Sequence, residues 1–223
     1  IQRGLRTLAA TTGTTPFAVA AFAFQVLLHR TSGGRQVAFA TPVSTRSHPA
    51  AASMVGYFTN PVVVTAEIDE HRSVADSVAR FHREVRTRLD HASVPFPVLA
   101  EGLAPPRRHD RHPIFQTMFV YQERSPAPGL GTARLEPMVV DLGASKFDLT
   151  LFVTDGSGPL EIAVEYRADR YGAVWMEQLL DHFQTLLAEL GADPDRPLAH
   201  VSMLARDERE RLRAFARGPG LEI

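Results

Sequence analysis

The sequence has 223 residues, of which 44% are hydrophobic and 22% charged, and its formal net charge is −1. This composition is that of an ordinary globular protein, and the near-zero charge argues against nucleic acid or an anionic membrane surface as a partner. The absence of cysteine excludes disulfides, thiolate metal ligands and a cysteine nucleophile, and it fits a cytoplasmic protein.

The chain opens in a helical pattern over residues 1–13, so we expect a fragment of a longer protein. Thr15 and Pro16 form an N-cap and a first-turn proline, which predict a second helix ending near Arg30. The most apolar window, residues 17–28, is too short to span a bilayer and lacks the basic leader of a signal peptide. This pattern predicts a helix buried on most sides, and no membrane partner is expected.

The next segments predict two strands followed by a helix. Residues 36–41 form a short apolar run, and residues 60–68 form a β-branched one. Ser73 is a typical N-cap, and apolar residues follow it at helical spacing: Val74, Val78, Phe81, Val85 and Leu89. Prolines then interrupt the pattern, and a short helical piece is expected near residues 98–101.

In the second half the hydrophobic period changes to that of strands. We expect strands over residues 113–122 and 133–141, then an antiparallel hairpin from residues 146–155 and 160–167. Helical spacing then returns, which predicts a long closing helix ended by Gly191. Its apolar positions are Trp175, Leu179, Phe183, Leu186, Leu187 and Leu190. A charged helix is expected after it, over residues 205–215. The fold class is therefore α/β, a mixed central sheet with helices packed on it.

The residues alone reveal no self-contained active site. None of the nine histidines is adjacent to another or part of an HExxH pair, so no metal site is expected. His109 and His112 flank an Asp-Arg pair where a metal or acid–base site is conceivable, but a polar turn before a strand is the favoured interpretation. No phosphate-binding loop or nucleophile elbow is present.

Several short stretches, taken in order, resemble the motifs of the condensation domain of nonribosomal peptide synthetases. The stretch "VGYFTNPVVV" is similar to I-G-x-F-V-N-T, "HASVPFPVL" to (H/N)-Q-D-x-P-F-E, and "RRHDRHPIF" to R-D-x-S-R-N-P-L. "TPVSTR" resembles T-P-V-x-G-R, and "KFDLTL" and the tail "PLAHVSMLARDERERL" are also typical of the family. The matching positions are Gly56, Phe58, Asn60, His91, Pro95, Phe96, Arg107, Arg111 and Pro113.

The sequence also departs from these motifs. The departures bear on fine substrate specificity more than on membership of the family, since most keep side-chain size or turn character. They are Thr45 for Gly, Thr59 and Pro61 for Val and Thr, Ala92 and Ser93 for Gln-Asp, Pro97 for Glu, and Arg108 and Asp110 for Asp and Ser.

The resemblance implies half of an enzyme. The family fold is two chloramphenicol-acetyltransferase-like lobes around a tunnel that admits 4'-phosphopantetheine arms from two carrier proteins. The catalytic HHxxxDG motif belongs to the N-terminal lobe and is absent here, so no catalytic residue is expected in this chain. Residues 1–200 would be the C-terminal lobe, and residues 201–223 would be an exit helix and linker toward an adenylation domain.

The same resemblance implies four supporting site residues. Arg46 would form an ion pair with the aspartate of HHxxxDG, since a guanidinium suits a carboxylate; a surface arginine is the alternative. Asn60 would line the tunnel or close a turn before Pro61. Tyr57 and Ser44 would also line the tunnel, although a strand core and a solvated loop explain them too. Segments 93–97 and 118–137 are where we place the crossover onto the other lobe.

The implied function is amide formation between a donor thioester and a carrier-bound amine. The implied partners are the N-terminal lobe, donor and acceptor peptidyl carrier proteins, and the adjacent adenylation domain, with no cofactor bound directly. A noncatalytic condensation-like module that recruits a carrier protein or partner enzyme is the alternative. A general acyl-CoA acyltransferase is a third, less favoured possibility.

Overall fold

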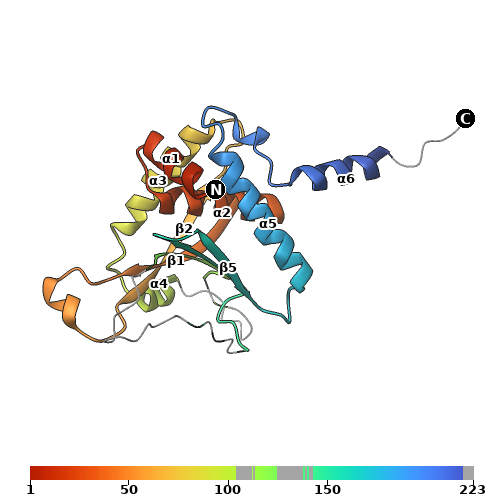
Figure 1. Ribbon diagram of the computed structural model, residues 1–223. Coiled ribbons are helices and arrows are strands. Elements are labelled where there is room, and N and C mark those ends of the chain that lie inside the picture. Colours follow the sequence, from red (N-terminus) through yellow and green to blue (C-terminus); the bar gives the residue numbers. More distant parts are fainter. Residues whose placement is uncertain (104–111, 113, 125–137, 139, 141–142, 218–223) are drawn as a thin grey trace, which may run out of the picture.

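The computed structural model describes residues 1–103, 112, 114–124, 138, 140 and 143–217, and they build one mixed sheet covered by helices (Figure 1). The strand order is β2-β1-β3-β4-β5. The strands are β1 (Gln36–Ser44), β2 (Thr59–Glu67), β3 (Thr117–Glu123), β4 (Leu149–Asp155) and β5 (Glu161–Tyr166). The predicted α/β class, with a mixed central sheet, is confirmed.

Two antiparallel hairpins flank a parallel centre. β1 pairs with β2 over its whole length, and β4 pairs with β5 as predicted from the alternation of their sequences. β3 lies between the hairpins and runs parallel to both β1 and β4, meeting β1 at Ala40 and Met118. Of residues 133–141, the structure describes only 138 and 140, so the strand predicted there is not tested.

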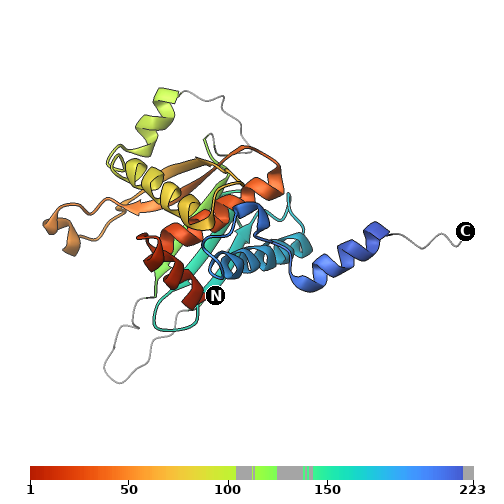
Figure 2. The same ribbon diagram turned by 90° about the horizontal axis from the view of Figure 1, so that it is seen from above.

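The helices α1 (Gln2–Thr11), α2 (Pro16–Ser32), α3 (Val74–Leu89) and α5 (Ala173–Leu190) cover one face of the sheet (Figures 1 and 2). α2 is the central one, and its ten residues from Ala18 to Leu27 are all buried. The Thr15 hydroxyl accepts a hydrogen bond from the Ala18 amide (3.2 Å), and Gly33 ends the helix at φ 68°. Both ends were predicted from the sequence.

Aromatic side chains join α2 to the sheet. The ring of Phe24 lies 5.4 Å from Phe39 of β1 and 5.5 Å from Phe119 of β3, and Phe183 of α5 packs edge-on at 6.5 Å. All four rings are fully buried. These separations are those of favourable aromatic pairs, so the core is centred on the junction between the two hairpins.

The prediction for the buried face of α5 was wrong at one position. Trp175 is 43% exposed, and its ring stacks on Tyr171 at 5.4 Å, whereas the neighbouring Met176 is buried. The remaining predicted residues of the face, from Leu179 to Leu190, are buried as expected. The helix therefore starts with its tryptophan turned outward, because Met176 occupies the position nearest the core.

A buried carboxylate attaches α1 to the sheet. Asp155, at the end of β4, accepts hydrogen bonds from Gln2 (2.7 Å), Arg6 (2.8 Å), the Tyr121 hydroxyl (2.8 Å) and the Gly156 amide (2.8 Å). Burial by itself would raise the pKa of Asp155, but these hydrogen bonds outweigh it and lower the pKa to about 2. Burial and the bond to Asp155 both raise the pKa of Tyr121, so the pair stays an ionised carboxylate and a neutral phenol.

The segment before the last helix is joined to α2 and to the connection that precedes α3. Arg30 makes a two-pronged ion pair with Glu70 (2.8 and 3.0 Å) and donates to the carbonyls of Leu198 and Val201. Beyond this point α6 (Arg206–Arg217) leaves the body of the molecule as an arm (Figure 1), with a His182–Glu208 pair (3.0 Å) at its base. The predicted exposed, charged helix is thus observed, and a boundary near residue 200 stays a prediction.

Within the described residues, no single helix is long and apolar enough to cross a membrane. α1 and α2 pass the same length and composition test only as a pair, and they meet at an angle of 106°. α2 is instead the buried helix of the core.

The contact between α1 and α5 leads to a stability prediction. A Cβ placed on Gly191 would lie 2.9 Å from the backbone of Gly4, whereas a Cβ on Gly102 of α4 (Phe96–Leu103) would meet nothing within 4 Å. Gly191→Ala should therefore lower the free energy of unfolding by about 1–3 kcal/mol, since a backbone must move. Gly102→Ala should be neutral or raise it by up to about 1 kcal/mol. Urea unfolding of both variants measures the difference, and equal midpoints would contradict the close contact.

Candidate functional site

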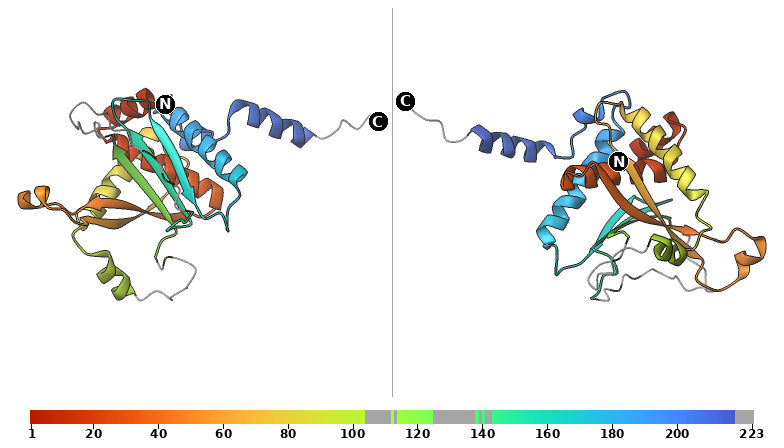
Figure 3. Two further views of the ribbon diagram at one scale, coloured as in Figure 1. Left: turned by 60° about the horizontal axis from the view of Figure 1, so that its bottom comes forward. Right: turned by 180° about the vertical axis from the view of Figure 1, so that it is seen from behind.

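The face of the sheet opposite the four helices is the candidate site. α4 lies on this side, and the connection between β1 and β2 extends beyond the sheet (Figures 1 and 3). Both carry large apolar side chains that are exposed, a feature shared with interaction surfaces. They are Met54, Val55 and Tyr57 in the connection, and Val94, Val98, Leu99 and Leu103 at α4.

Arg46 organises the connection between β1 and β2. Its Nη1 donates to the carbonyls of Ala51 and Met54 (2.9 Å to the latter), and its guanidinium carbon lies 4.0 Å from the centre of the Phe58 ring. The Thr45 amide also donates to the Phe58 carbonyl (2.8 Å), closing the base of the loop. Arg46 is exposed but held in place by these contacts, so its orientation is fixed within this chain.

Two hydroxyl-bearing residues, Ser44 and Tyr57, were also predicted to belong to this site. Ser44 ends β1 exposed, and its hydroxyl accepts a weak bond from the Arg46 amide (3.4 Å). Tyr57 is 88% exposed, so the strand core considered for it is not observed. The structure gives a reason for the Gly56 that precedes it, since a Cβ there would lie 3.1 Å from the Phe58 ring.

Asn60 bonds to a segment more than thirty residues away. Its Nδ2 donates to the carbonyls of Ala92 (2.9 Å) and Val94 (2.8 Å), and its Oδ1 accepts from the Phe96 amide (2.9 Å). This half-buried carboxamide thereby connects the start of β2 with the chain that leads into α4. No pattern in the residues predicts this contact, because neither segment identifies the other.

An aromatic cluster continues from this contact, and sequence reasoning missed it. The His112 ring lies 4.0 Å from Phe115, 5.3 Å from Phe96 and 5.6 Å from Phe147. Burial among these rings lowers the pKa of His112, so the imidazole is neutral at neutral pH. The predicted polar turn is therefore an apolar contact at His112, while His109 lies outside the described residues.

Asp148, in the "KFDLTL" stretch, has a structural environment. It is buried at the start of β4, and its Oδ1 lies 3.5 Å from Arg170 and 3.9 Å from Arg167. The Asp148 carbonyl also accepts a bond from the Arg167 amide (3.1 Å). These contacts hold the end of β5 against the beginning of β4, next to the aromatic cluster.

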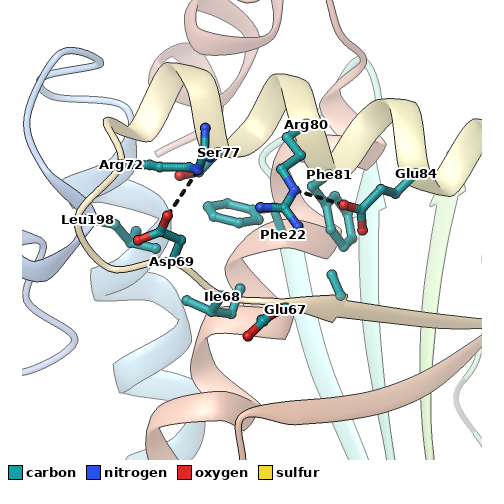
Figure 4. A pocket seen from close by; sticks show the side chains of 11 residues that line it. Phe22, Glu67, Ile68, Asp69, Arg72, Ser77, Arg80, Phe81, Glu84 and Leu198 are labelled. Atoms are coloured by element: carbon teal, nitrogen blue, oxygen red, sulfur yellow. Dashed lines mark hydrogen bonds and ion pairs between the residues drawn. The ribbon is translucent and has the colours of Figure 1, made fainter.

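A recess on the helix side of the molecule is too small to be a substrate site (Figure 4). It lies between β2 and α3 and has a volume of about 10 Å³, which is room for about one water molecule. Its charged groups are paired, with Arg72 at 3.0 Å from Asp69 and Arg80 at 2.9 Å from Glu84. In the described part of the chain, no three His, Asp or Glu side chains gather closely enough to hold a metal ion.

The sequence matches the condensation-domain family over residues 1–213. The chain belongs to this family. It is 32% identical over 216 residues to chondramide synthase cmdD of Chondromyces crocatus, covering 95% of this chain but 5% of that protein. The chain therefore spans a small part of the length of the curated relatives it matches.

Solved structures show the same fold. A four-domain nonribosomal peptide synthetase bound to AMP and glycine superposes with a TM-score of 0.84 at 23% identity, covering 92% of this chain and 17% of that one. The condensation domain of the monacolin K polyketide synthase MokA gives 0.81 at 20% identity, covering 89% and 46%. The condensation-domain fold thus agrees with the resemblance found in the motifs.

The geometry of Arg46 gives a prediction about the loop it holds. Arg46→Gln removes the bonds to Ala51 and Met54 and the stacking on Phe58, so the loop should open more often. We expect amide hydrogen exchange at Met54 and Thr45 to quicken about tenfold, the equivalent of one net hydrogen bond. Arg35→Gln, at the 89% exposed start of the same hairpin, is the matched control. Unchanged exchange in Arg46→Gln would mean that the loop is ordered by other contacts.

Proposed function

We propose that this chain is the C-terminal lobe of a condensation domain that forms an amide in nonribosomal peptide synthesis. The observation that carries the proposal is the family match over residues 1–213. It is supported by coverage, since the chain superposes on 46% of the length of a solved condensation domain. In this reaction the carrier-bound amine attacks the donor thioester, and the acyl group passes from sulfur to nitrogen. The HHxxxDG motif of the family is absent from the sequence, so we expect no activity from this chain alone.

The open face of the sheet supports the assignment of a missing half. Helices cover one face, while exposed apolar side chains gather at α4 and at the β1–β2 connection on the other side. An N-terminal lobe placed there would bury them and would close a tunnel between the two lobes. The 4'-phosphopantetheine arms of donor and acceptor carrier proteins would enter this tunnel, and no cofactor would be bound by the chain itself.

Arg46 is the residue that we propose to meet the catalytic loop of the other lobe. Its Nη1 donates to two carbonyls of its own loop, and one face of its guanidinium packs on the Phe58 ring, so the guanidinium plane is fixed. Among the described residues nothing binds the opposite edge of the fork, so it can receive the aspartate of HHxxxDG in the planar geometry that arginine–carboxylate pairs prefer. Such a pair would orient the catalytic loop without transferring a proton.

The other proposed contacts follow the position of Arg46. Ser44 bonds to the Arg46 amide, Tyr57 lies in the same connection, and both are exposed; we propose that they line the tunnel. Asn60 is predicted to line the same tunnel, and its carboxamide is bonded to residues 92–96 in this chain. The arm formed by α6 would lead toward the adenylation domain.

A noncatalytic module that recruits a carrier protein or a partner enzyme is the second candidate. Both candidates agree with the absence of HHxxxDG from these 223 residues. The two candidates differ in one property, since only the first yields amide when the N-terminal lobe is supplied.

Reconstitution tests the proposal. This chain should give no amide from loaded donor and acceptor carriers, and a separately supplied N-terminal lobe should restore synthesis. In the restored enzyme Arg46→Ala should lower kcat/KM about 10- to 100-fold, the effect of a charge-assisted hydrogen bond of about 1.5–3 kcal/mol.

The control is Arg35→Ala, which removes the same charge from an exposed site at the far end of the hairpin and should leave kcat/KM unchanged. Binding of a carrier protein without amide synthesis would support the noncatalytic module. Full activity of Arg46→Ala in a stable reconstituted enzyme would exclude the proposed role of Arg46.

A further inference from the structure

We propose that Asn60 is a positioning residue that fixes Phe96 and α4 on the open face of the sheet and acts on the reaction through them. This inference rests on the proposed function, because it concerns the same face of the molecule. It differs from the tunnel-lining role expected from the motif, in which the carboxamide would touch substrate directly.

The first argument is that the Asn60 carboxamide already makes its hydrogen bonds within this chain. An asparagine side chain offers two N–H donors and one carbonyl oxygen. The donors bind the carbonyls of Ala92 and Val94, and the oxygen binds the amide of Phe96. A substrate that took the donor bound to Ala92 would leave a partly buried main-chain carbonyl without its partner, which costs free energy. The bond to Val94 is exposed, so water can replace that donor.

The second argument is the position of Phe96 at the start of α4. The first amides of a helix have no carbonyl partner within the helix, so a group outside it must accept their hydrogen bonds. The Asn60 oxygen serves the Phe96 amide in this way at 2.9 Å. Asn60 therefore caps α4 from a neighbouring strand, in the role that a local Ser or Asp usually fills.

The third argument is that α4 has few other attachments among the residues that the structure describes. None of its residues is buried, and three of its apolar side chains are more than a third exposed: Val98, Leu99 and Leu103. Phe96 is the residue that packs inward, at 5.3 Å from His112 and 5.6 Å from Phe115. The place of α4 therefore depends on the Asn60 bonds on one side and on this aromatic contact on the other.

A pair of matched variants in the reconstituted two-lobe enzyme tests the inference. Asn60→Leu and Gln25→Met each remove a carboxamide that donates to two main-chain carbonyls. Gln25 lies in α2, on the helix side of the sheet, and donates to the carbonyls of Val37 and Ala66. Both should lower the melting temperature. Only Asn60→Leu should lower kcat per folded enzyme, about tenfold with KM for either carrier changed less than about threefold.

A double-mutant cycle with Phe96→Leu separates positioning from substrate contact. If Asn60 acts through Phe96, the double variant should be about as slow as the slower single variant. Multiplicative losses in kcat would assign Asn60 an independent contact with substrate and would overturn the inference. An equal loss of kcat in Gln25→Met would also overturn it, because general destabilisation would then account for the effect.

Amide hydrogen exchange provides a readout that does not depend on activity. The Phe96 amide should exchange about tenfold faster in Asn60→Leu and at the normal rate in Gln25→Met. If the wild-type reconstituted enzyme made no amide, the proposed function would fail, while unchanged exchange at Phe96 would separately refute the positioning role. Asn60→Ser, whose hydroxyl cannot reach three partners, gives the same comparison should Asn60→Leu not fold.

Discussion

The packing of α2 against the junction of the two hairpins is the interaction on which the rest of the structure depends. β1 and β3 meet at Ala40 and Met118, so the centre of the sheet needs support beyond its own ladder. Phe24 provides it by packing against both Phe39 and Phe119. Because α2 is buried along ten residues, α1, α3 and α5 can pack around it and complete one covered face.

This one-sided arrangement decides where the chemistry can lie. A sheet has two faces, and an α/β layer buries each against another element. In this chain the second face has α4 and a cluster of rings at one end, and exposed apolar residues beside them. The motif residues Asn60 and Phe96 lie at this open side, which we propose another polypeptide completes.

Much of the fold could be predicted because its signals are local. The caps of α2 and α3, the apolar period of α3 and the alternation of β4 and β5 each involve residues within a few turns of one another. The site was less predictable, since the bonds of Asn60 to residues 92–96 join segments without a shared pattern. His112 was read as part of a polar turn because its neighbours in sequence are charged, whereas its neighbours in space are aromatic.

Arg46 and Asn60 share a property that bears on how a partner lobe would bind. Each uses its polar atoms on main-chain carbonyls or amides of its own chain, and each thereby orders a segment that would otherwise be free. Ordering a loop on association costs part of the binding free energy, so a surface that is already ordered binds more tightly for the same contacts. The exposed residues Met54, Val55 and Tyr57 stand on such a surface. Their presentation is therefore a consequence of the bonds of Arg46, which links the role proposed for its guanidinium to the shape of the loop around it.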